Sequence, residues 1–506
     1  MTTLQELKDK WFIDVTLEGQ FPPQTRFEGA MVRPYTDGNH LEPLVDGAAL
    51  MAEFHDQLEF LLQQDDPSEW NLFISAMNIH PVKLLGVNNP AKDAMSKILD
   101  VAEAGVHVYY LGSGHAGAAQ VASSFAKKLM KFGSEGSADK RFPPAGGQHQ
   151  KFTVAQGPDN QWLATLGSAD FFKTNWDTPE HLAENPDRHK GAGAIHNLSC
   201  RIEGPLAQDI ALNFAERWND KATSNRTSPE IQSTIDTRFR ETPAAPVGTH
   251  SVQLLRIYAL ESKAGESYSW AEHGEFTVWA SYLNAIKQAQ KYVYLEDQYL
   301  FPFRFDPVME NPDDVAQKAD IFFQLGEALK RGVDVICLVP GRDDAVFKHY
   351  EFQQRRRGAN YLRNIAENHP GAGRFVFTKL HVGGKDPVIH AKVMLVDDEL
   401  ALVGSANIAL RSMALCSEIH MAIIDEKNEF ARDLRYKLWA EHMELDEDDE
   451  ILVDPREAVG AYYENAKSEQ GRLRLLPTTR LETELPYNAI WDSLIDPYYG
   501  PDPDAQ

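Results

Sequence analysis

The chain has 506 residues, which is too long for one ordinary hydrophobic core and predicts two large lobes or domains. Its 75 acidic and 50 basic residues give a formal net charge of −25, which opposes non-specific approach to nucleic acids and anionic bilayers. Three widely spaced cysteines form no zinc-binding pattern and suit a reducing compartment. This composition favours an enzyme acting on small molecules or zwitterionic lipids over a nuclease.

The sequence contains no signal for crossing a membrane. Its N-terminus lacks an apolar h-region and a cleavage pattern. No run of about 18 apolar residues occurs in the chain. We therefore expect a cytoplasmic protein that meets a membrane only at the surface. Secretion by a route that needs no signal peptide is the alternative.

The first half of the chain alternates predicted helices and strands. Apolar spacing near 3.6 residues predicts a helix over residues 55–64, followed by a strand over 70–79. A second helix over 91–105 ends at a glycine and precedes a strand over 106–114. Residues 149–171 predict a β-hairpin around a GPDN turn.

The second half repeats this order of elements. The corresponding helices and strands are predicted over residues 281–290, 291–300, 319–332, 333–341, 373–380 and 388–412. The alternation predicts an α/β fold with two similar α/β/α lobes, each containing a mixed sheet. We place the first lobe at residues 1–219 and the second, with a C-terminal tail, at 252–506. The polar, proline-rich residues 220–251 predict a connector.

A histidine and a lysine recur two residues apart in both halves. The first pair is His149 and Lys151, and the second is His390 and Lys392. Residues i and i+2 of a strand face the same side, so the members of each pair are expected to project together. A lone H-x-K is a common surface pair. The second copy, however, continues in the strict pattern H-x-K-x4-D-x6-G-S-x-N, and the first copy recurs between matching elements. The other residues of the two motifs are Gly167, Ser168, Asp170, Asp397, Gly404, Ser405 and Asn407.

Two histidines and two lysines suit the chemistry of a phosphate diester. Lysine donates to phosphoryl oxygens as a compact charge, and histidine, with an ordinary pKa of about 6.5, serves as nucleophile or acid. One histidine can attack while the other protonates the leaving oxygen. Because the lysines supply positive charge, we predict no metal and no cofactor. Glu418 is expected to hold an imidazole in one tautomer.

These motifs resemble those of the phospholipase D superfamily, which is marked by two His-Lys-Asp motifs. Residues 175–181, 193–219, 292–300 and 438–445 also resemble segments of classical phospholipase D, so the resemblance extends from about residue 40 to 445. It implies a bilobal fold with pseudo-twofold symmetry and an active site at the lobe interface. It also implies hydrolysis through a covalent phosphohistidine.

The resemblance also implies roles for individual residues. His149 is the expected nucleophile, and His390 is the expected general acid, oriented by Glu418. Asn197 is expected to accept a hydrogen bond from His149. The residues expected to bind the phosphoryl group are Lys151, Lys392, Ser168, Ser405 and Asn407, with Asp170 at the position that matches Asn407.

The first half departs from the family pattern at three positions. Gln156 stands where the first motif should carry an acid, and Asp170 replaces the asparagine of G-S-x-N. Asn197 replaces the aspartate of the family's His-Asp pair, so it brings no negative charge. These departures bear on the efficiency of the first half more than on its role.

The expected function is hydrolysis of a glycerophospholipid to phosphatidic acid and a free head group, with transfer to an alcohol as a side reaction. One alternative is a phosphatidyl transferase, similar to cardiolipin or phosphatidylserine synthases. Others are a nuclease or other phosphodiesterase, and a catalytically dead binding module. The expected partners are a phospholipid, with a zwitterionic head group, and the membrane surface. No nucleic-acid partner is expected, and the sequence does not indicate an oligomeric state.

Two further segments have two interpretations each. The three arginines at 355–357 lie on a predicted helix, where they could meet lipid phosphates or form a solvated face. The apolar residues 299–305 could line a groove for acyl chains or belong to a lobe core.

Overall fold

The computed structural model describes residues 2–115, 117–143, 145–220, 231, 233–260, 268–303, 315–341 and 346–478. Part of the predicted connector (221–230 and 232) and the predicted tail after residue 478 lie outside these ranges.

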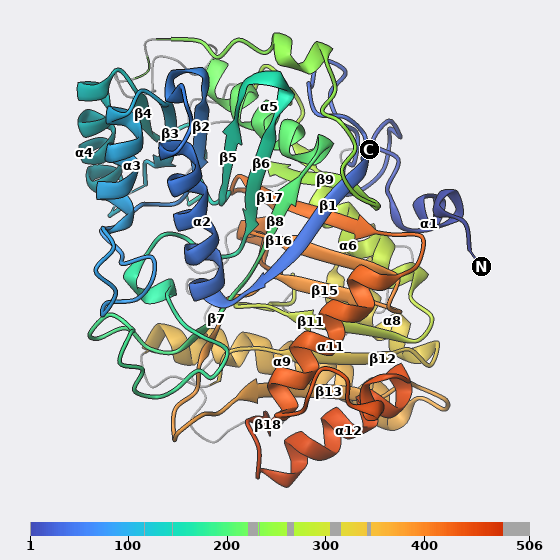
Figure 1. Ribbon diagram of the computed structural model, residues 1–506. Coiled ribbons are helices and arrows are strands. Elements are labelled where there is room, and N and C mark those ends of the chain that lie inside the picture. The colour runs from blue at the N-terminus through green and yellow to red at the C-terminus, as the bar shows by residue number, and fades with distance from the viewer. Residues whose placement is uncertain are drawn as a thin grey trace.

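A large mixed β-sheet forms the centre of the molecule (Figure 1). In the first half its strands are β1 (Thr36–Val45), β2 (Asn71–Ser75), β3 (His107–Ser113), β4 (Glu135–Asp139), β5 (Phe152–Gln156), β6 (Trp162–Gly167) and β8 (Leu198–Glu203). In the second half they are β9 (His250–Tyr258), β10 (Glu275–Phe276), β11 (Tyr292–Glu296), β12 (Asp334–Leu338), β13 (Phe375–Leu380), β15 (Val393–Val396), β16 (Leu400–Gly404), β17 (Glu418–Ile424) and β18 (Leu473–Leu475). Two short strands, β7 (Ile195–His196) and β14 (Val388–Ile389), form a separate parallel pair.

The strand order is the same on both sides of the sheet's centre. Moving outward, the first half runs β1-β8-β6-β5-β2-β3-β4 and the second runs β9-β17-β16-β15-β11-β12-β13-β18. In each half the strands β2-β3-β4 and β11-β12-β13 are parallel neighbours. These features confirm the α/β class. We predicted one mixed sheet per lobe, but the described strands other than β7 and β14 form one continuous sheet because β1 pairs with β9. The pseudo-twofold relation and the lobe boundaries stay predictions.

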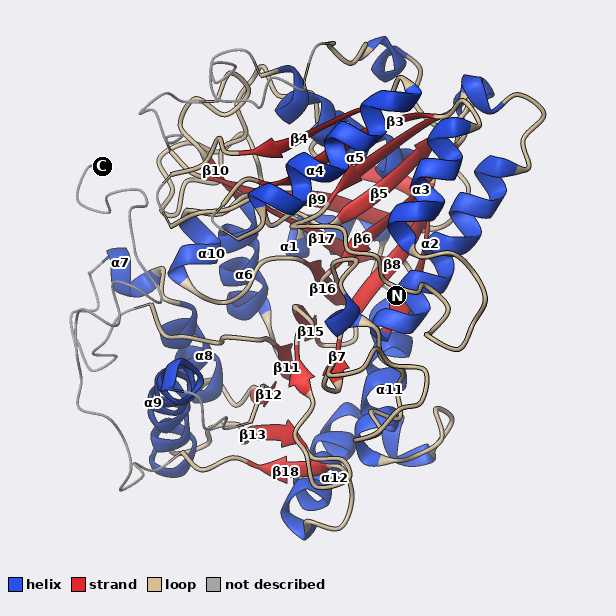
Figure 2. Ribbon diagram, turned by 90° about the vertical axis from the view of Figure 1, so that its left-hand side faces the viewer, coloured by secondary structure: helices blue, strands red, loops and turns tan. Residues whose placement is uncertain are grey.

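Helices cover both faces of this sheet. They are α1 (Leu4–Trp11), α2 (Asp46–Leu62), α3 (Ala94–Glu103), α4 (Ala119–Leu129), α5 (Pro205–Asn219), α6 (Thr277–Gln288), α7 (Val315–Lys318), α8 (Ile321–Lys330), α9 (Val346–Asn368), α10 (Leu410–Ala414), α11 (Glu429–Met443) and α12 (Pro455–Ser468). Figure 2 shows α8 and α9 on one side of β12 and β13, and α11 and α12 on the other. The predicted helices over 55–64, 91–105, 281–290 and 319–332 fall on α2, α3, α6 and α8.

Local sequence signals explain where two of these helices begin and end. The Asp93 and Asp320 side chains accept hydrogen bonds from the first-turn amides of α3 and α8, which is the usual role of an N-cap aspartate. Gly105 and Gly332, with φ of 114° and 86°, follow the two helices, a conformation that costs glycine little.

The hydrophobic cores link the two halves of the chain. One cluster joins residues of β6, β8 and α5 to residues of β15, β16 and α11. Another joins Leu7 and Trp11 of α1 to α6 and α8, so the N-terminal helix packs against the second half (Figure 1). A third lies within the first half, around α2, α3 and β2. Because apolar surface is shared in this way, neither half buries its own core completely.

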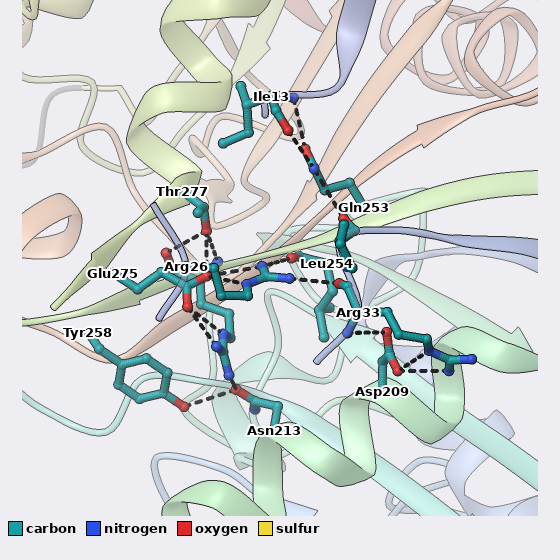
Figure 3. Close-up of polar contacts among 12 residues, drawn as sticks. Ile13, Arg26, Arg33, Asp209, Asn213, Gln253, Leu254, Tyr258, Glu275 and Thr277 are labelled. Carbon is teal, nitrogen blue, oxygen red and sulfur yellow. Dashed lines mark hydrogen bonds and ion pairs between the residues drawn. The ribbon is translucent and has the colours of Figure 1, made fainter. Parts of the chain in front are cut away.

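Buried ion pairs also cross between the halves (Figure 3). Arg26 Nη2 lies 3.0 Å from Glu275 Oε1, and Arg256 Nη2 lies 2.6 Å from Glu275 Oε2. Arg256 also pairs with Glu216 of α5. Burial would raise the pKa of Glu275, but Arg256 and Arg26 lower it to about 2. This carboxylate is therefore charged and fully paired, as a buried ion must be.

The structure decides parts of two open interpretations. Arg355 and Arg356 are buried and donate to the backbone carbonyls of Gln298 and Thr478, so the predicted solvated face is wrong for these two residues. Leu300 belongs to a hydrophobic core cluster and Phe301 is buried, as the core interpretation predicted. Residues 304 and 305 of the same segment lie outside the described ranges.

Within the described ranges, no helix combines the length and the apolarity that crossing a bilayer requires.

Candidate active site

The two His-Lys pairs lie in extended segments at the edges of strands. His149 and Lys151 directly precede β5, and His390 and Lys392 lie between β14 and β15. We predicted both pairs within strands, which is wrong by one to three residues at each site. Each lysine ammonium group nevertheless donates to the carbonyl of its own histidine.

Each histidine segment is held by the opposite half of the chain. The amide of His149 donates to the carbonyl of Ser417, at 3.1 Å, beside a parallel bridge between Gln148 and Ser417. The amide of His390 donates to the carbonyl of His196, at 2.7 Å, where β14 pairs with β7. Backbone hydrogen bonds thus hold each motif beside a segment of the other half.

Glu418 contacts His149. Its two carboxylate oxygens lie 2.9 and 2.8 Å from His149 Nδ1. We predicted that Glu418 orients His390, which is wrong. The Gln148–Ser417 bridge places the start of β17, where Glu418 lies, beside the first motif.

Asn197 contacts His390. Its Oδ1 lies 2.8 Å from His390 Nδ1. We predicted Asn197 as the partner of His149, which is also wrong. The parallel β7–β14 pair, which ends at His196 and Ile389, brings the next residues of the two strands together. Glu418 and Asn197 therefore each contact the other histidine from the one that we predicted.

Both imidazoles are oriented by acceptors at Nδ1. An ionised carboxylate only accepts hydrogen bonds, so Glu418 fixes the proton of neutral His149 on Nδ1 and leaves the Nε2 lone pair available. Burial lowers the pKa of His149, Glu418 opposes this effect, and Lys151 adds to it. Burial raises the pKa of Glu418, but His149 and Lys151 hold it below its ordinary value. The pair is therefore a neutral imidazole beside an anion.

Lys151 is buried beside an acidic residue. Its Nζ donates to the carbonyl of His149, at 2.8 Å, and lies 3.4 Å from Asp170 Oδ2. Asp170 Oδ1 also accepts the amide of Met77, at 2.6 Å. Asp170, which we predicted among the substrate-binding residues, is thus placed as the counter-ion of Lys151.

Lys392, like Lys151, is buried. Its Nζ donates to the carbonyl of His390 and lies 3.4 Å from Gln298 Oε1. Burial lowers the pKa of Lys392 to about 7, and the nearby carboxylate of Asp297 opposes this shift. An arriving phosphate anion would add negative charge here and favour the protonated lysine.

The serines of the two G-S motifs contact the partners of the histidines. Ser405 Oγ donates to Glu418 Oε2, at 2.6 Å, and Ser168 Oγ donates to Asn197 Oδ1, at 3.1 Å. Both serines are fully buried. We predicted that their hydroxyls donate to the phosphate. Because both hydroxyl protons are used within the protein, we correct this assignment: the serines position Glu418 and Asn197.

Asn407 is buried at the end of the second motif. Its amide N–H donates to Ser412 Oγ, at 2.9 Å, and its Oδ1 has no hydrogen-bond partner within the described ranges. Phosphate binding by Asn407 stays a prediction.

The remaining motif residues are structural, as predicted. Asp397 accepts hydrogen bonds from the amides of residues 290–292, at 2.8 to 3.0 Å, which ties the β15–β16 turn to the start of β11. A Cβ on Gly404 would lie 2.3 Å from the carbonyl oxygen of Ile419, and one on Gly167 would lie 2.5 Å from that of Leu198. Both glycines therefore permit close approach of neighbouring strands.

The departure at Gln156 lies in a structural contact of the same kind. Gln156 Oε1 accepts a hydrogen bond from Asn71 Nδ2, at 3.3 Å, at the pairing of β5 with β2. An acid at this position would be negatively charged, whereas Gln156 and Asn71 form a neutral pair. The pair lies at the end of β5 that is farther from His149. Its effect is on the fold of the first half rather than on the chemistry.

Three polar residues near the site were missed by the sequence prediction. Ser412 Oγ donates to Glu418, and Gln298 contacts Lys392. Gln150 donates to the carbonyl of Glu418, at 3.1 Å, and to the hydroxyl of Tyr258, at 3.0 Å. Figure 3 shows Tyr258 in contact with Asn213. Asn213 Nδ2 also donates to Gln150 Oε1, at 3.0 Å. Gln150 and Ser412 lie close in sequence to the motifs, and Gln298 lies in the segment 292–300 that resembles phospholipase D.

Comparisons with known proteins found family models that match the regions of both motifs. The family model described as "Phospholipase D" matches residues 147–304, and the one described as "Cardiolipin synthase, PLD-like domain" matches residues 282–440. The crystal structure of phosphatidylserine synthase from Haemophilus influenzae Rd KW20 has the same fold, with a TM-score of 0.50 at 13% identity, over 89% of this chain and 91% of that one.

Curated relatives match at modest identity. Phospholipase D A of Dictyostelium discoideum is 26% identical over 299 residues, which cover 49% of this chain and 21% of that protein. Phospholipase D delta of Arabidopsis thaliana is 24% identical over 447 residues, which cover 65% of this chain and 51% of that protein. The chain thus spans between about a fifth and a half of these relatives' lengths. Together with the two family models and the paired His-Lys motifs, these matches show that the chain belongs to the phospholipase D superfamily.

Proposed function

We propose that the protein is a phospholipase D that hydrolyses a glycerophospholipid to phosphatidic acid and a free head group through a phosphohistidine. The observation that carries this proposal is the contact between Glu418 and His149 Nδ1 in a site that also contains two buried lysines. A neutral, oriented imidazole is a nucleophile, and ammonium groups bind the charge of a phosphodiester without a metal.

In the first step, His149 Nε2 attacks phosphorus and the bond to the head-group oxygen breaks. His390 gives its proton to that oxygen, and the head group leaves as an alcohol. Lys151 and Lys392 donate to the non-bridging oxygens. The phosphorylated His149 carries a positive charge, which the Glu418 carboxylate stabilises.

In the second step, water replaces the histidine. His390, now neutral, accepts a proton from the water, whose oxygen bonds to phosphorus as the bond to His149 breaks. Phosphatidic acid leaves, and both histidines return to their starting states. An alcohol that reaches the intermediate would react in the same way and give a phosphatidyl alcohol.

The choice of His149 as the nucleophile rests on the side chain that contacts the Nδ1 atom of each histidine. Attack makes the nucleophilic imidazole cationic, and an anion beside it lowers the energy of that state. Glu418 provides this anion to His149, whereas the side chain that contacts His390 Nδ1 is the neutral Asn197. The contacts of His149 therefore stabilise a phosphorylated, cationic imidazole better than those of His390.

A phospholipid substrate is supported by the names of the relatives and by the charge of the chain. The relatives that match are phospholipases D. The net charge of −25 opposes polyanionic nucleic acid, and it is compatible with a zwitterionic head group at a membrane surface.

A phosphatidyl transferase is the second candidate, favoured by the match to a cardiolipin synthase model over residues 282–440. The two candidates share the first step and differ in the acceptor. Only the second step distinguishes water from a lipid or amino-acid alcohol.

The direct test is incubation of the purified protein with a panel of phospholipids, with and without ethanol, followed by mass analysis of the products. We expect phosphatidic acid from a zwitterionic lipid and phosphatidylethanol when ethanol is present, with neither product from His149→Ala. Formation of phosphatidylserine from CDP-diacylglycerol and serine, or of cardiolipin with phosphatidylglycerol as the acceptor, without hydrolysis of any lipid, would support the transferase instead. Digestion of plasmid DNA without lipid turnover would contradict both.

A further inference from the structure

A second cluster of ionisable side chains lies next to the candidate active site. Asp46, His181, His196 and Glu441 each bring one nitrogen or oxygen atom to within 4.8 Å of the others. Asp46 begins α2 and His196 ends β7, both in the first half, whereas Glu441 lies on α11 in the second. The first three side chains are fully buried, and Glu441 is 9% exposed.

Four distances between these side chains are close to the ligand–ligand distances of a metal site, with Asp46 measured from one carboxylate oxygen to each histidine. His181 Nε2 lies 3.2 Å from Glu441 Oε1 and 3.8 Å from Asp46 Oδ2. His196 Nδ1 lies 3.0 Å from Asp46 Oδ1 and 3.7 Å from Glu441 Oε1. A tetrahedral zinc site with bonds of about 2.0–2.2 Å has ligand atoms about 3.3–3.6 Å apart. The observed distances lie on both sides of this range.

The outer nitrogen of each histidine contacts a further carboxylate. His181 Nδ1 lies 3.0 Å from Asp177 Oδ2, and His196 Nε2 lies 3.1 Å from Glu296 Oε2. A histidine that binds a metal usually donates its other N–H to a carboxylate or carbonyl, which fixes the tautomer and strengthens the ligand. Both histidines have this arrangement.

Three of the inward-facing atoms lack hydrogen bonds. Asp46 Oδ2, His181 Nε2 and Glu441 Oε1 are buried and make no well-aligned hydrogen bond within the described ranges, although His181 Nε2 and Glu441 Oε1 lie 3.2 Å apart as an ion pair. Buried polar atoms are nearly always satisfied, so three in one place indicate a missing partner. A cation between them would satisfy all three at once.

A surface hollow lies beside one side of this cluster. Glu441 lines a hollow of about 320 Å³ together with Glu180, Glu444 and Glu447. Lys437 and Arg472 lie in the same wall, so carboxylates outnumber cations there by four to two. A hollow with an excess of one charge attracts ions of the other sign.

We propose that Asp46, His181, His196 and Glu441 bind one divalent transition-metal ion, with Zn²⁺ as the ion that this ligand set favours. Two imidazoles and two carboxylates are suitable ligands for zinc. Because the protein supplies four ligands and leaves no open position, the ion is structural rather than catalytic. It connects α2 and β7 to α11, and so joins the two halves of the chain.

The position of His196 gives the ion an indirect connection to the catalytic residues. The His196 carbonyl accepts the amides of His390 and Ala391, at 2.7 and 3.0 Å, and the next residue is Asn197. An ion bound to His196 would therefore steady the segment that orients His390. No step of the proposed hydrolysis passes through the ion.

The test is the metal content and metal response of the full chain, prepared without a metal-affinity tag. We expect close to one equivalent of Zn²⁺ per chain after gel filtration. After removal of the ion by a chelator, we expect added Zn²⁺ to raise the melting temperature. Added Co²⁺ should give the intense visible absorption of a tetrahedral site.

Two variants of similar surface charge sharpen this test. Glu441→Gln removes one ligand with little change in shape, and it should weaken Zn²⁺ binding by more than about tenfold and change the Co²⁺ spectrum. Glu447→Gln removes a carboxylate from the same hollow and should bind Zn²⁺ with at least near-normal affinity. A wild-type chain with no bound metal, no Co²⁺ spectrum and no thermal response to Zn²⁺ would overturn the proposal. Such a result leaves the lipid assay unaffected, because the readouts are independent of turnover.

Discussion

The contact between Glu418 and His149 gives two apparently similar histidines different properties. Glu418 also accepts hydrogen bonds from Ser405 and Ser412, so its carboxylate is held in place and is kept ionised by its neighbours. Asn197 has the same position relative to His390, and it is held by Ser168 in the same way, but it is neutral. At the scale of single residues, one carboxylate distinguishes the two motifs.

Glu418→Gln should lower the rate of hydrolysis and shift its pH dependence. Burial lowers the pKa of His149 and Glu418 raises it part of the way back, so loss of the carboxylate lowers this pKa further. His149 then stays neutral to lower pH, and the acidic limb of kcat/KM should move to lower pH. The rate should fall on the order of 10²–10⁴-fold, because the cationic intermediate loses its anion. A pH–rate profile checks both effects; an acidic limb that moves to higher pH would contradict the proposed state of His149. Ser412→Ala, which keeps the carboxylate but removes one of its hydrogen bonds, is the matched comparison and should have a much smaller effect than Glu418→Gln.

Lys151→Ala and Lys392→Ala should each lower turnover on the order of 10²–10³-fold, the usual cost of losing one preorganised donor. Each lysine contacts the backbone carbonyl of its own motif histidine, which places both ammonium groups beside the reacting atoms. Steady-state rates on a zwitterionic lipid measure the effect, and thermal melting shows whether the variants are folded. Near-normal rates in a folded variant would mean that the lysine does not face the phosphoryl group.

Strand pairing across the halves explains the contacts of the histidines. The pairing of β14 with β7, and the bridge of Gln148 with Ser417, place each motif beside a segment from the other half. The G-S glycines matter at the same scale, because they let β6 approach β8 and let β16 approach β17.

Gly404→Ala should destabilise the fold. The new methyl group would lie 2.3 Å from the Ile419 carbonyl oxygen, and the backbone on both strands would have to move. We expect a loss of about 1–3 kcal/mol in the free energy of unfolding, the usual cost of overpacking. Gly193→Ala is the control, because a methyl group at that position would have no neighbouring atom within 4 Å and should be nearly neutral. Denaturant titration compares the two variants, and equal stability would contradict the close approach.

The sequence was informative where the signal was local and uninformative where the contact was distant. Motif spacing and turn residues determine some features of the site, so these features could be predicted. They are the His-Lys pairs, the glycines of the two G-S motifs and the structural role of Asp397. The partners of Glu418 and Asn197 could not, since they depend on which strands pair across more than 190 intervening residues. The serines were misassigned for a related reason: the acceptors of their hydroxyl groups are Glu418, at the start of the neighbouring strand β17, and Asn197, directly before β8. The continuous sheet was also missed, because the β1–β9 pairing joins elements that the repeat assigns to separate lobes.

The whole molecule has one site made from two halves, and the halves depend on each other for stability. Helix α1 packs against α6, and Arg26 pairs with Glu275, although both N-terminal partners belong to the predicted first lobe. Shared cores and buried ion pairs of this kind make the halves poor independent units.

Residues 1–220 and 250–506, expressed separately, should each be inactive and poorly soluble. Each fragment would expose the edge of β1 or β9 and an unpaired side of the shared core. The second fragment would also contain Glu418 without its partner His149. Lipid turnover by dilute fragments measures this dependence, with the co-expressed pair as the control. Turnover by the second fragment alone, at concentrations too low for self-association, would refute the shared site.

The central claim is that His149 carries the phosphoryl group and His390 supplies the proton. A p-nitrophenyl phosphodiester tests it most directly, because its leaving group needs little protonation. His390→Ala should release a burst of p-nitrophenol and accumulate a phosphohistidine, which mass spectrometry of digests kept away from acid should locate at His149. His149→Ala should show neither the burst nor the adduct. An adduct located on His390 in the wild-type protein would contradict the account, and it would mean that the neutral partner, Asn197, belongs to the nucleophile.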